Sequence, residues 1–215
     1  GSGNDTLIGG AGNDTYVVDS TSDTVTENAS EGTDLIQSSV TFTASNNVEN
    51  LTLTGSSNIN AIGNNLDNII TGNIGNNNIS GGDGTDTVIF AGDIGQYTFS
   101  IDAISGDITI SDSYSSRDGN DTVNSIENYS FNNQNYDLGD VVRKTNFDEW
   151  SYLASYSDLV RAFGTNTTAA FNHYVNYGHQ TGRSPDIFDE WSYLASNVDL
   201  ISVFGTNTAA ATQHY

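Results

Sequence analysis

Residues 81–89 read Gly81-Gly82-Asp83-Gly84-Thr85-Asp86-Thr87-Val88-Ile89, and residues 9–17 repeat the pattern as G-G-A-G-N-D-T-Y-V. Both follow G-G-x-G-x-D-x-U-x, in which U is a large apolar residue. The sixth position of this pattern recurs every nine residues along two stretches of the chain. Its occupants are Asp5, Asp14 and Asp23, and then Asn68, Asn77 and Asp86. A fixed period of this kind predicts a repeat architecture.

Each nonapeptide divides into a six-residue turn and a three-residue strand. The glycines permit positive φ and let one backbone approach the next without a clash at Cβ. The central residue of the strand points inward, as Val88 does in the copy at 81–89. One coil takes two nonapeptides, so turns eighteen residues apart lie on the same edge. We therefore expect Asp5 to stack on Asp23, and Asn68 to stack on Asp86.

Stacked carboxylates repel each other unless a cation lies between them. Turn carbonyls and aspartate oxygens supply the six to eight contacts at roughly 2.3–2.6 Å that Ca²⁺ prefers, whereas Mg²⁺ demands octahedral geometry and keeps its waters. The absence of Cys and of clustered His disfavours a transition metal. The predicted calcium-site residues are Asp5, Gly10, Gly12, Asp14, Asp23, Asp34, Asn68, Asn77, Gly82, Gly84, Asp86 and Asp121.

A simpler interpretation treats Asp, Asn and Gly at short intervals as turn formers only. We favour calcium binding for the complete copies, but both interpretations stay open for the asparagine-bearing turns at 63–80. A neutral side chain lowers the ligand charge, so Asn68 and Asn77 would make weaker sites or calcium-free turns. Asp34 is an intermediate case, because its turn lacks the first glycine pair. Asp121 carries the D-T-V signature and is a better candidate than Asp118.

The nonapeptide resembles the calcium-binding repeat of RTX (hemolysin-type) secreted bacterial proteins. The resemblance rests on the phased copies within residues 1–26 and 63–90. It implies a parallel β-roll that binds Ca²⁺, export through a type I secretion channel as an unfolded chain, and folding outside the cell or at its surface.

The amino-acid composition agrees with folding that depends on ion binding. The 215-residue chain is 35% apolar and has a formal net charge of −22 with only five basic residues. Such a chain should stay expanded without counterions. Nucleic acid and anionic membranes are improbable partners because no basic patch exists, and no apolar run is long enough to span a bilayer. No signal peptide is visible and the chain opens within a repeat, so we expect a fragment or a trimmed product.

Three sections are expected along the chain. Residues 1–92 should form the roll, with an irregular insertion at 27–60 where the nine-residue phase slips. Strand-like stretches continue there at 34–36, 40–42 and 51–53, so the inserted residues should bulge as loops without ending the roll. Residues 93–145 should form a β cap, because residues 96–101 and 107–111 alternate polar with apolar side chains across a Ser-Gly turn, a hairpin signal. A cap covers the apolar end and the unpaired strand edge of a solenoid.

The third section, residues 146–215, is predicted to be α-helical. Residues 147–155 read F-D-E-W-S-Y-L-A-S and recur letter for letter at 188–196, an offset of 41 residues. A period of this length is typical of helical repeats, and the second copy is truncated by comparison with the first. Gly164 should end one helical stretch, and Asn166 or Thr167 should cap the next. The section resembles tandem repeats that accompany RTX arrays. The expected fold class is thus mainly β: a calcium-binding parallel β-roll with an antiparallel cap and a small α-helical tandem-repeat region.

No enzymatic signature is present. The chain lacks H-E-x-x-H, G-x-S-x-G and a P-loop. His173 and His179 are better explained by packing or capping than by a metal site, and Trp150 and Trp191 by packing than by sugar stacking. We therefore do not expect an enzyme.

The favoured function is a calcium-binding structural segment of a large secreted bacterial protein, such as a surface layer, filament, matrix protein or adhesin. Expected partners are calcium ions, further copies of the chain in a fibre or lattice, and cell-surface polysaccharide, without membrane insertion. Two alternatives stay open. One is the non-catalytic C-terminal module of a type I-secreted protease, lipase or epimerase, and the other is a carbohydrate-binding module.

Overall fold

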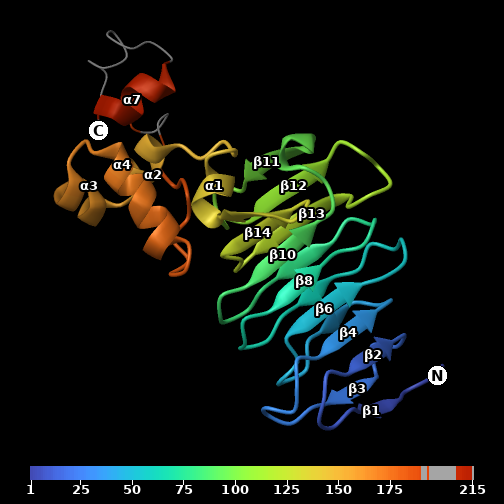
Figure 1. Cartoon of the computed structure of the whole chain (residues 1–215). Coiled ribbons are helices and arrows are strands. Elements are labelled where there is room, and N and C mark those ends of the chain that lie inside the picture. The colour runs from blue at the N-terminus through green and yellow to red at the C-terminus, as the bar shows by residue number, and fades with distance from the viewer. Residues whose placement is uncertain (190–192, 194–206, 215) are drawn as a thin grey trace. The chain divides into compact units, whose positions relative to one another are not determined.

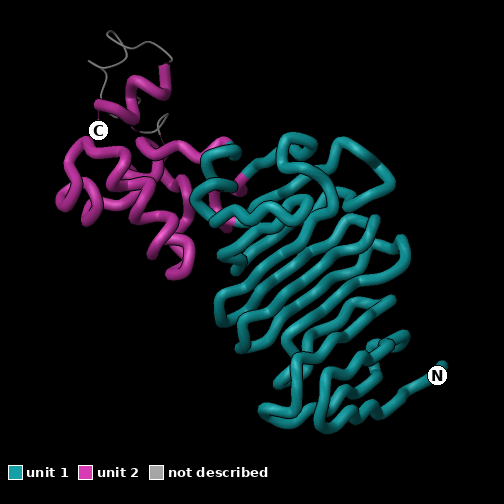
Figure 2. The backbone as a smooth tube through the Cα atoms, viewed as in Figure 1, with its two compact units in different colours: residues 1–100, 107–145 teal, residues 101–106, 146–215 magenta. Residues whose placement is uncertain are grey.

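The computed structural model describes residues 1–189, 193 and 207–214. The chain forms two compact units, which Figure 2 distinguishes by colour. The first contains residues 1–100 and 107–145, and the second contains residues 101–106 and 146–215. No helix among the described residues is long and apolar enough to cross a membrane.

The first unit is a parallel β-solenoid of short strands, which Figure 1 shows stacked from the N-terminus towards the green strands. Each coil contributes one strand to each of two faces. The strands are β1 (Thr6–Ile8), β2 (Thr15–Val18), β3 (Thr24–Thr26), β4 (Leu35–Ser38), β5 (Phe42–Thr43), β6 (Asn50–Leu53), β7 (Ala61–Ile62), β8 (Ile69–Thr71), β9 (Asn78–Ser80) and β10 (Thr87–Phe90).

Among β1 to β10, the even-numbered strands lie in one sheet, and the odd-numbered strands lie opposite in two sheets, β1-β3 and β11-β12-β13-β9-β7-β5. The first sheet has the order β15-β14-β10-β8-β6-β4-β2, and its roll strands pair in parallel. The central apolar residue of each strand fills the space between the faces, as expected from the x-U-x pattern. Ile36, Leu51, Ile70 and Val88 are completely buried, and Tyr16 is 5% exposed. The mainly β fold class with a parallel roll is thus confirmed.

Residues 27–60, expected as an irregular insertion, build further rungs of the same sheets. β4 pairs with β2 and β6, and β5 pairs with β7, all in parallel. Successive turns along one edge are 20, 15 and 18 residues apart where Asp34 follows Asp14, Glu49 follows Asp34 and Asp86 follows Asn68. The phase slip is therefore a change in turn length, because the register of a parallel ladder depends on which side chain points inward and not on the sequence interval.

The end of the solenoid is closed by mixed pairing. The closing elements are η1 (Ile94–Gln96), β11 (Tyr97–Ile101), β12 (Ile108–Asp112), β13 (Asn120–Asn124), β14 (Asn128–Phe131), β15 (Gln134–Asp137) and α1 (Leu138–Val142). β13 and β14 continue the coils in parallel on β9 and β10. β12 then runs antiparallel to β13, and β15 antiparallel to β14. The antiparallel strands cover ladder edges that would otherwise stay unpaired.

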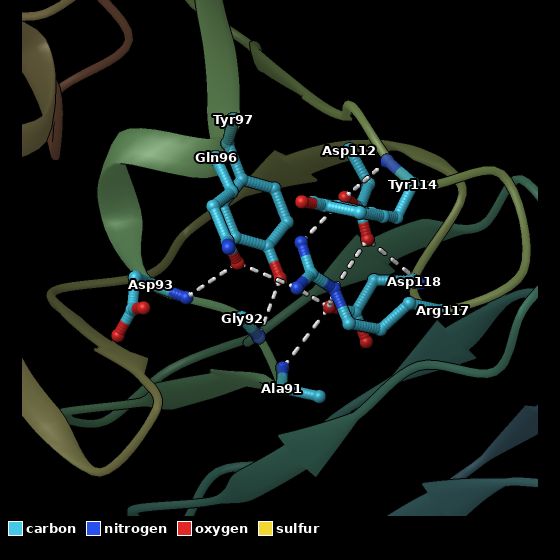
Figure 3. A network of polar contacts seen from close by, with 9 residues as sticks. All are labelled: Ala91, Gly92, Asp93, Gln96, Tyr97, Asp112, Tyr114, Arg117 and Asp118. Carbon is cyan, nitrogen blue, oxygen red and sulfur yellow. Dashed lines mark hydrogen bonds and ion pairs between the residues drawn. The ribbon is translucent and has the colours of Figure 1, made fainter.

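A polar network built around Arg117 joins the loops of this cap, as Figure 3 shows. The guanidinium donates to both carboxylate oxygens of Asp112 and to Gln96, and it lies between the rings of Tyr97 and Tyr114. Burial by itself would raise the pKa of Asp112, but the hydrogen bonds from Arg117 bring that pKa below its ordinary value. The cap therefore neutralises a buried carboxylate with a cation of the chain itself.

The second unit is helical. Its described helices are α2 (Glu149–Ser155), α3 (Ser157–Phe163), α4 (Thr167–His173), the π-helix η2 (Tyr174–Gly178) and α7 (Thr208–His214). α3 ends at Gly164, and Asn166 caps α4 by accepting from Ala169 N.

The two copies of the 41-residue repeat share a side-chain pair. Tyr152 Oη lies 2.9 Å from His173 Nδ1, and Tyr193 Oη lies 2.9 Å from His214 Nδ1. His173 therefore has a neighbouring side chain of its own unit within hydrogen-bond distance. Trp191 and most of the second copy lie outside the described residues.

Candidate metal centre

Residues immediately before the strands, or at the start of a strand in the case of Asp121 in β13, form two columns, one along each edge of the roll. The edge column that leads into the even strands contains Asp14, Asp34, Glu49, Asn68, Asp86 and Glu127. The edge column that leads into the odd strands contains Asp5, Asp23, Asn77 and Asp121.

A repeated hydrogen bond links neighbours within a column: a side-chain oxygen accepts the backbone N–H of the residue one coil earlier. Asp23 accepts from Asp5 at 2.9 Å, and Asp86 accepts from Asn68 at 2.7 Å. Asp121 accepts from Asn77 at 2.8 Å although 44 residues separate them. The expected stacking of residues eighteen apart is therefore present on both edges.

Several carboxylates keep a second oxygen that nothing in the described chain satisfies. Asp14 Oδ2, Asp34 Oδ2 and Asp86 Oδ2 are buried and have no hydrogen-bond partner among the described residues. An uncompensated buried carboxylate oxygen costs several kcal/mol. These oxygens lie against the turns. A Cβ at Gly81 would collide with Asp86 Oδ2 and with the carbonyl of Ser125, so carboxylate and carbonyl oxygens converge there.

Two groups of three carboxylates bring ligand atoms within 4.8 Å of one another near the N-terminus. One comprises Asp14, Glu27 and Asp34, and the other comprises Asp5, Asp19 and Asp23. Residues 1–116 contain no Lys or Arg, because the first basic residue of the sequence is Arg117. Neither group of carboxylates therefore has a Lys or Arg from this part of the chain to neutralise it. A set of hard oxygen donors with excess negative charge suits Ca²⁺, and the residues present fit that ion.

The pKa values differ along the columns according to burial and hydrogen bonding. Burial raises the pKa of Asp86 to about 6 and that of Asp121 to about 7. Backbone N–H groups, first that of Asp5, lower the pKa of Asp23. The Tyr16 hydroxyl, which donates to Glu27, lowers the pKa of Glu27. Without a cation, Asp86 and Asp121 therefore resist ionisation, while Asp23 and Glu27 favour it.

The glycines of the complete nonapeptides shape the turns as predicted. Gly82 adopts a φ of 104°, and a Cβ there would collide with the carbonyl of Asn64 one coil earlier. The other predicted turn glycines, Gly10, Gly12 and Gly84, also have positive φ.

Four acidic residues join the carboxylate groups although the nonapeptide pattern does not predict them: Asp19, Glu27, Glu49 and Glu127. Glu49 accepts from Asp34 N at 2.9 Å, and Glu127 accepts from Asp86 N at 2.8 Å. Both glutamates therefore occupy the position of an aspartate in the column. A sequence signal exists, because V-E-N-L at 48–51 and I-E-N-Y at 126–129 share an apolar-E-N-apolar pattern directly before or into a strand.

Fold and site together define a β-roll whose stacked turns bind calcium through carboxylate and carbonyl oxygens. The family model of the RTX calcium-binding nonapeptide repeat (4 copies) matches residues 1–25 and 62–96. These two segments therefore carry RTX-type nonapeptide repeats, and the ion that this repeat binds is Ca²⁺. The matched ranges leave out residues 26–61, where the turn lengths depart from the nine-residue period. No curated protein matches the chain.

Proposed function

We propose that this chain is a calcium-folded structural segment of a secreted bacterial protein, such as a surface layer, filament, matrix protein or adhesin, and that it has no catalytic role. The observation that carries the proposal is the set of buried carboxylate oxygens on Asp14, Asp34 and Asp86 that lack partners within the described chain. Ionised groups of this kind destabilise the coils that carry them unless a cation neutralises them.

Calcium concentration then decides where the segment folds. In a calcium-poor cytosol, the net charge of −22 opposes folding of the coils that carry the carboxylates. Outside the cell, each ion that binds only the folded state adds RT ln(1 + [L]/Kd), about 2.7 kcal/mol at 100 times Kd. A few such sites are comparable with the whole stability of a domain.

The test is a calcium titration of the purified chain, followed by circular dichroism and size-exclusion chromatography. We expect β-structure and compactness to rise together with calcium, and magnesium at equal ionic strength to have much less effect. A chain that is equally compact and structured in chelator would refute the proposal. Sedimentation at saturating calcium tests self-association into a fibre or lattice, and the gene upstream of residue 1 tests the alternative that the segment belongs to a secreted enzyme.

A further inference from the structure

Two turns in the middle of the roll replace the calcium-binding pattern with a second one. They read G-N-N-L-D-N at 63–68 and G-N-I-G-N-N at 72–77. Compared with G-G-A-G-N-D at 9–14 and G-G-D-G-T-D at 81–86, both have Asn in place of the second glycine and Asn in place of the sixth-position Asp. The two changes occur together, once on each edge of the roll.

In the first of these turns the side-chain amides bind the carbonyls of the preceding coil. Asn64 Nδ2 donates to Ser45 O and Val48 O, both at 2.8 Å. Asn68 Nδ2 donates to Val48 O at 3.1 Å and to Glu49 O at 3.2 Å. Asn68 Oδ1 in turn accepts from Asn64 N at 2.7 Å.

The second turn repeats this arrangement on the other edge. Asn73 Nδ2 donates to Thr54 O at 3.1 Å and to Ser57 O at 3.0 Å. Asn77 Nδ2 donates to Ile59 O at 2.6 Å, and Asn77 Oδ1 accepts from Asn73 N at 2.9 Å. The second hydrogen bond of Asn77 Nδ2 goes to Asn73 Oδ1 at 2.9 Å and not to another carbonyl, but both turns use a pair of amides to bind carbonyls of the preceding coil.

In these turns the side-chain amides form the hydrogen bonds to turn carbonyls, whereas in the aspartate turns an ion would contact the turn oxygens. Asn68 and Asn77 are buried and have hydrogen-bond partners on both amide atoms. Asp14 and Asp86, at the same position of the complete nonapeptides, each keep a buried oxygen without a partner among the described residues. An NH₂ group presents two donors to turn carbonyls, which is the electrostatic role of a bound cation.

Charge follows the same division. Residues 39–80 contain two acidic residues, Glu49 and Asp67, whereas residues 1–38 contain seven, and neither segment contains Lys or Arg. Self-repulsion therefore opposes folding of the N-terminal coils far more than folding of the middle coils.

We propose that the asparagine pairs make residues 45–80 a calcium-independent nucleus of the roll, and that calcium controls the coils whose turns carry carboxylates, above all the N-terminal coils that contain β1 to β4. This inference rests on calcium binding by the carboxylate turns. Folding of the solenoid is then graded with calcium concentration. The middle coils are folded at low calcium, and the N-terminal coils fold as the calcium concentration rises. Coils of a solenoid contact only their neighbours, so partial folding of this kind is allowed.

Hydrogen exchange of the full chain, read by mass spectrometry in chelator and in calcium, tests the division. In chelator we expect peptides from residues 45–80 to be protected at least about tenfold more than peptides from residues 1–38. Calcium should then raise the protection of residues 1–38. Equal loss of protection from both segments in chelator would overturn the inference.

A double variant tests the amide turns directly. Asn64→Gly with Asn68→Asp converts residues 63–68 to the calcium pattern, and it should lower protection of residues 45–80 in chelator by at least about tenfold, with recovery in calcium. Asn65→Asp is the matched control, because this side chain lies exposed in the same turn and adds the same charge. A double variant that keeps its protection in chelator would overturn the role of the asparagines. If all coils of the wild type were protected in chelator, both the calcium-coupled folding and the calcium control of β1 to β4 would be refuted. If the double variant then lost protection in chelator, the stabilising role of the asparagine amides would still be supported.

Discussion

The substitution Asp86→Asn should change the sign of its effect on stability when calcium is added. Asp86 is completely buried; its Oδ1 accepts from Asn68 N at 2.7 Å and its Oδ2 has no partner among the described residues. An asparagine keeps the Oδ1 acceptor, removes the buried charge and supplies an NH₂ group of the kind that Asn68 directs at turn carbonyls. The variant therefore separates the charge of the site from its hydrogen bond.

The magnitude without calcium follows from the pKa. Burial raises the pKa of Asp86 from 3.8 to about 6, and each unit corresponds to about 1.4 kcal/mol. Because water entering a calcium-free turn screens part of this cost, we expect the variant to be about 1–2 kcal/mol more stable than wild type in chelator at pH 8. With calcium at about 100 times Kd, loss of one site removes about 2.7 kcal/mol. The variant should then be about 1 kcal/mol less stable.

Urea unfolding followed by circular dichroism, with and without calcium, measures both values. Asp83→Asn is the matched control, since Asp83 is an exposed acid of the same turn and its loss changes the net charge equally. We expect the control to shift stability by less than about 0.5 kcal/mol in either buffer. An Asp86→Asn variant that is destabilised equally with and without calcium would show that the carboxylate is a structural hydrogen-bond acceptor and not a calcium ligand.

Three further outcomes test other parts of the molecule. In chelator, the unfolding free energy of the first unit should rise as pH falls from about 8 to about 5. The folded-state pKa values of Asp86, about 6, and of Asp121, about 7, lie above the pKa of an unfolded aspartate. The stability that these two groups contribute is therefore present at low pH and is lost as pH rises through those values. Urea midpoints across this range measure it, and a flat or opposite trend would contradict the assigned burial. Arg117→Met should destabilise the cap by about 2–3 kcal/mol with or without calcium, since the Asp112 carboxylate loses its charged donor. The control is Lys144→Met, which removes the same charge from an exposed side chain and should have little effect on stability. Tyr152→Phe should lower the stability of the second unit by about 1 kcal/mol through loss of the contact with His173, measured by thermal unfolding.

Much of the roll can be predicted from local pattern. The inward position of Val88 and the stacking of Asn68 on Asp86 follow from a nine-residue period, because that period determines both which residue faces the core and which turns share an edge. The ion follows from the same residues, since stacked carboxylates with glycine-rich turns suit an oxygen-coordinated dication. Charge and composition add the expectation that folding depends on that ion.

Other members of the columns lie outside the nine-residue period, and the apolar-E-N-apolar pattern around them does not by itself place them in a column. Glu49 and Glu127 lie in the column because the register of the sheet places them beside Asp34 and Asp86, at intervals of 15 and 41 residues that no period predicts. Residues 27–60 likewise continue the roll with turns of unequal length, since a ladder tolerates such variation as long as an apolar residue points inward.

A calcium-binding β-roll within residues 1–90 can be predicted from the sequence, because the period, the glycines and the aspartates act within a single repeat. The folded structure is needed to tell which turns leave carboxylate oxygens for the ion and which turns pair their polar groups by hydrogen bonds. Asn68 and Asp86 occupy the same column, yet Asn68 finds its partners at Val48 and Glu49 one coil away, whereas Asp86 keeps an oxygen without one. The physical reason is that hydrogen bonds between coils join residues whose separation in sequence depends on the length of every turn between them.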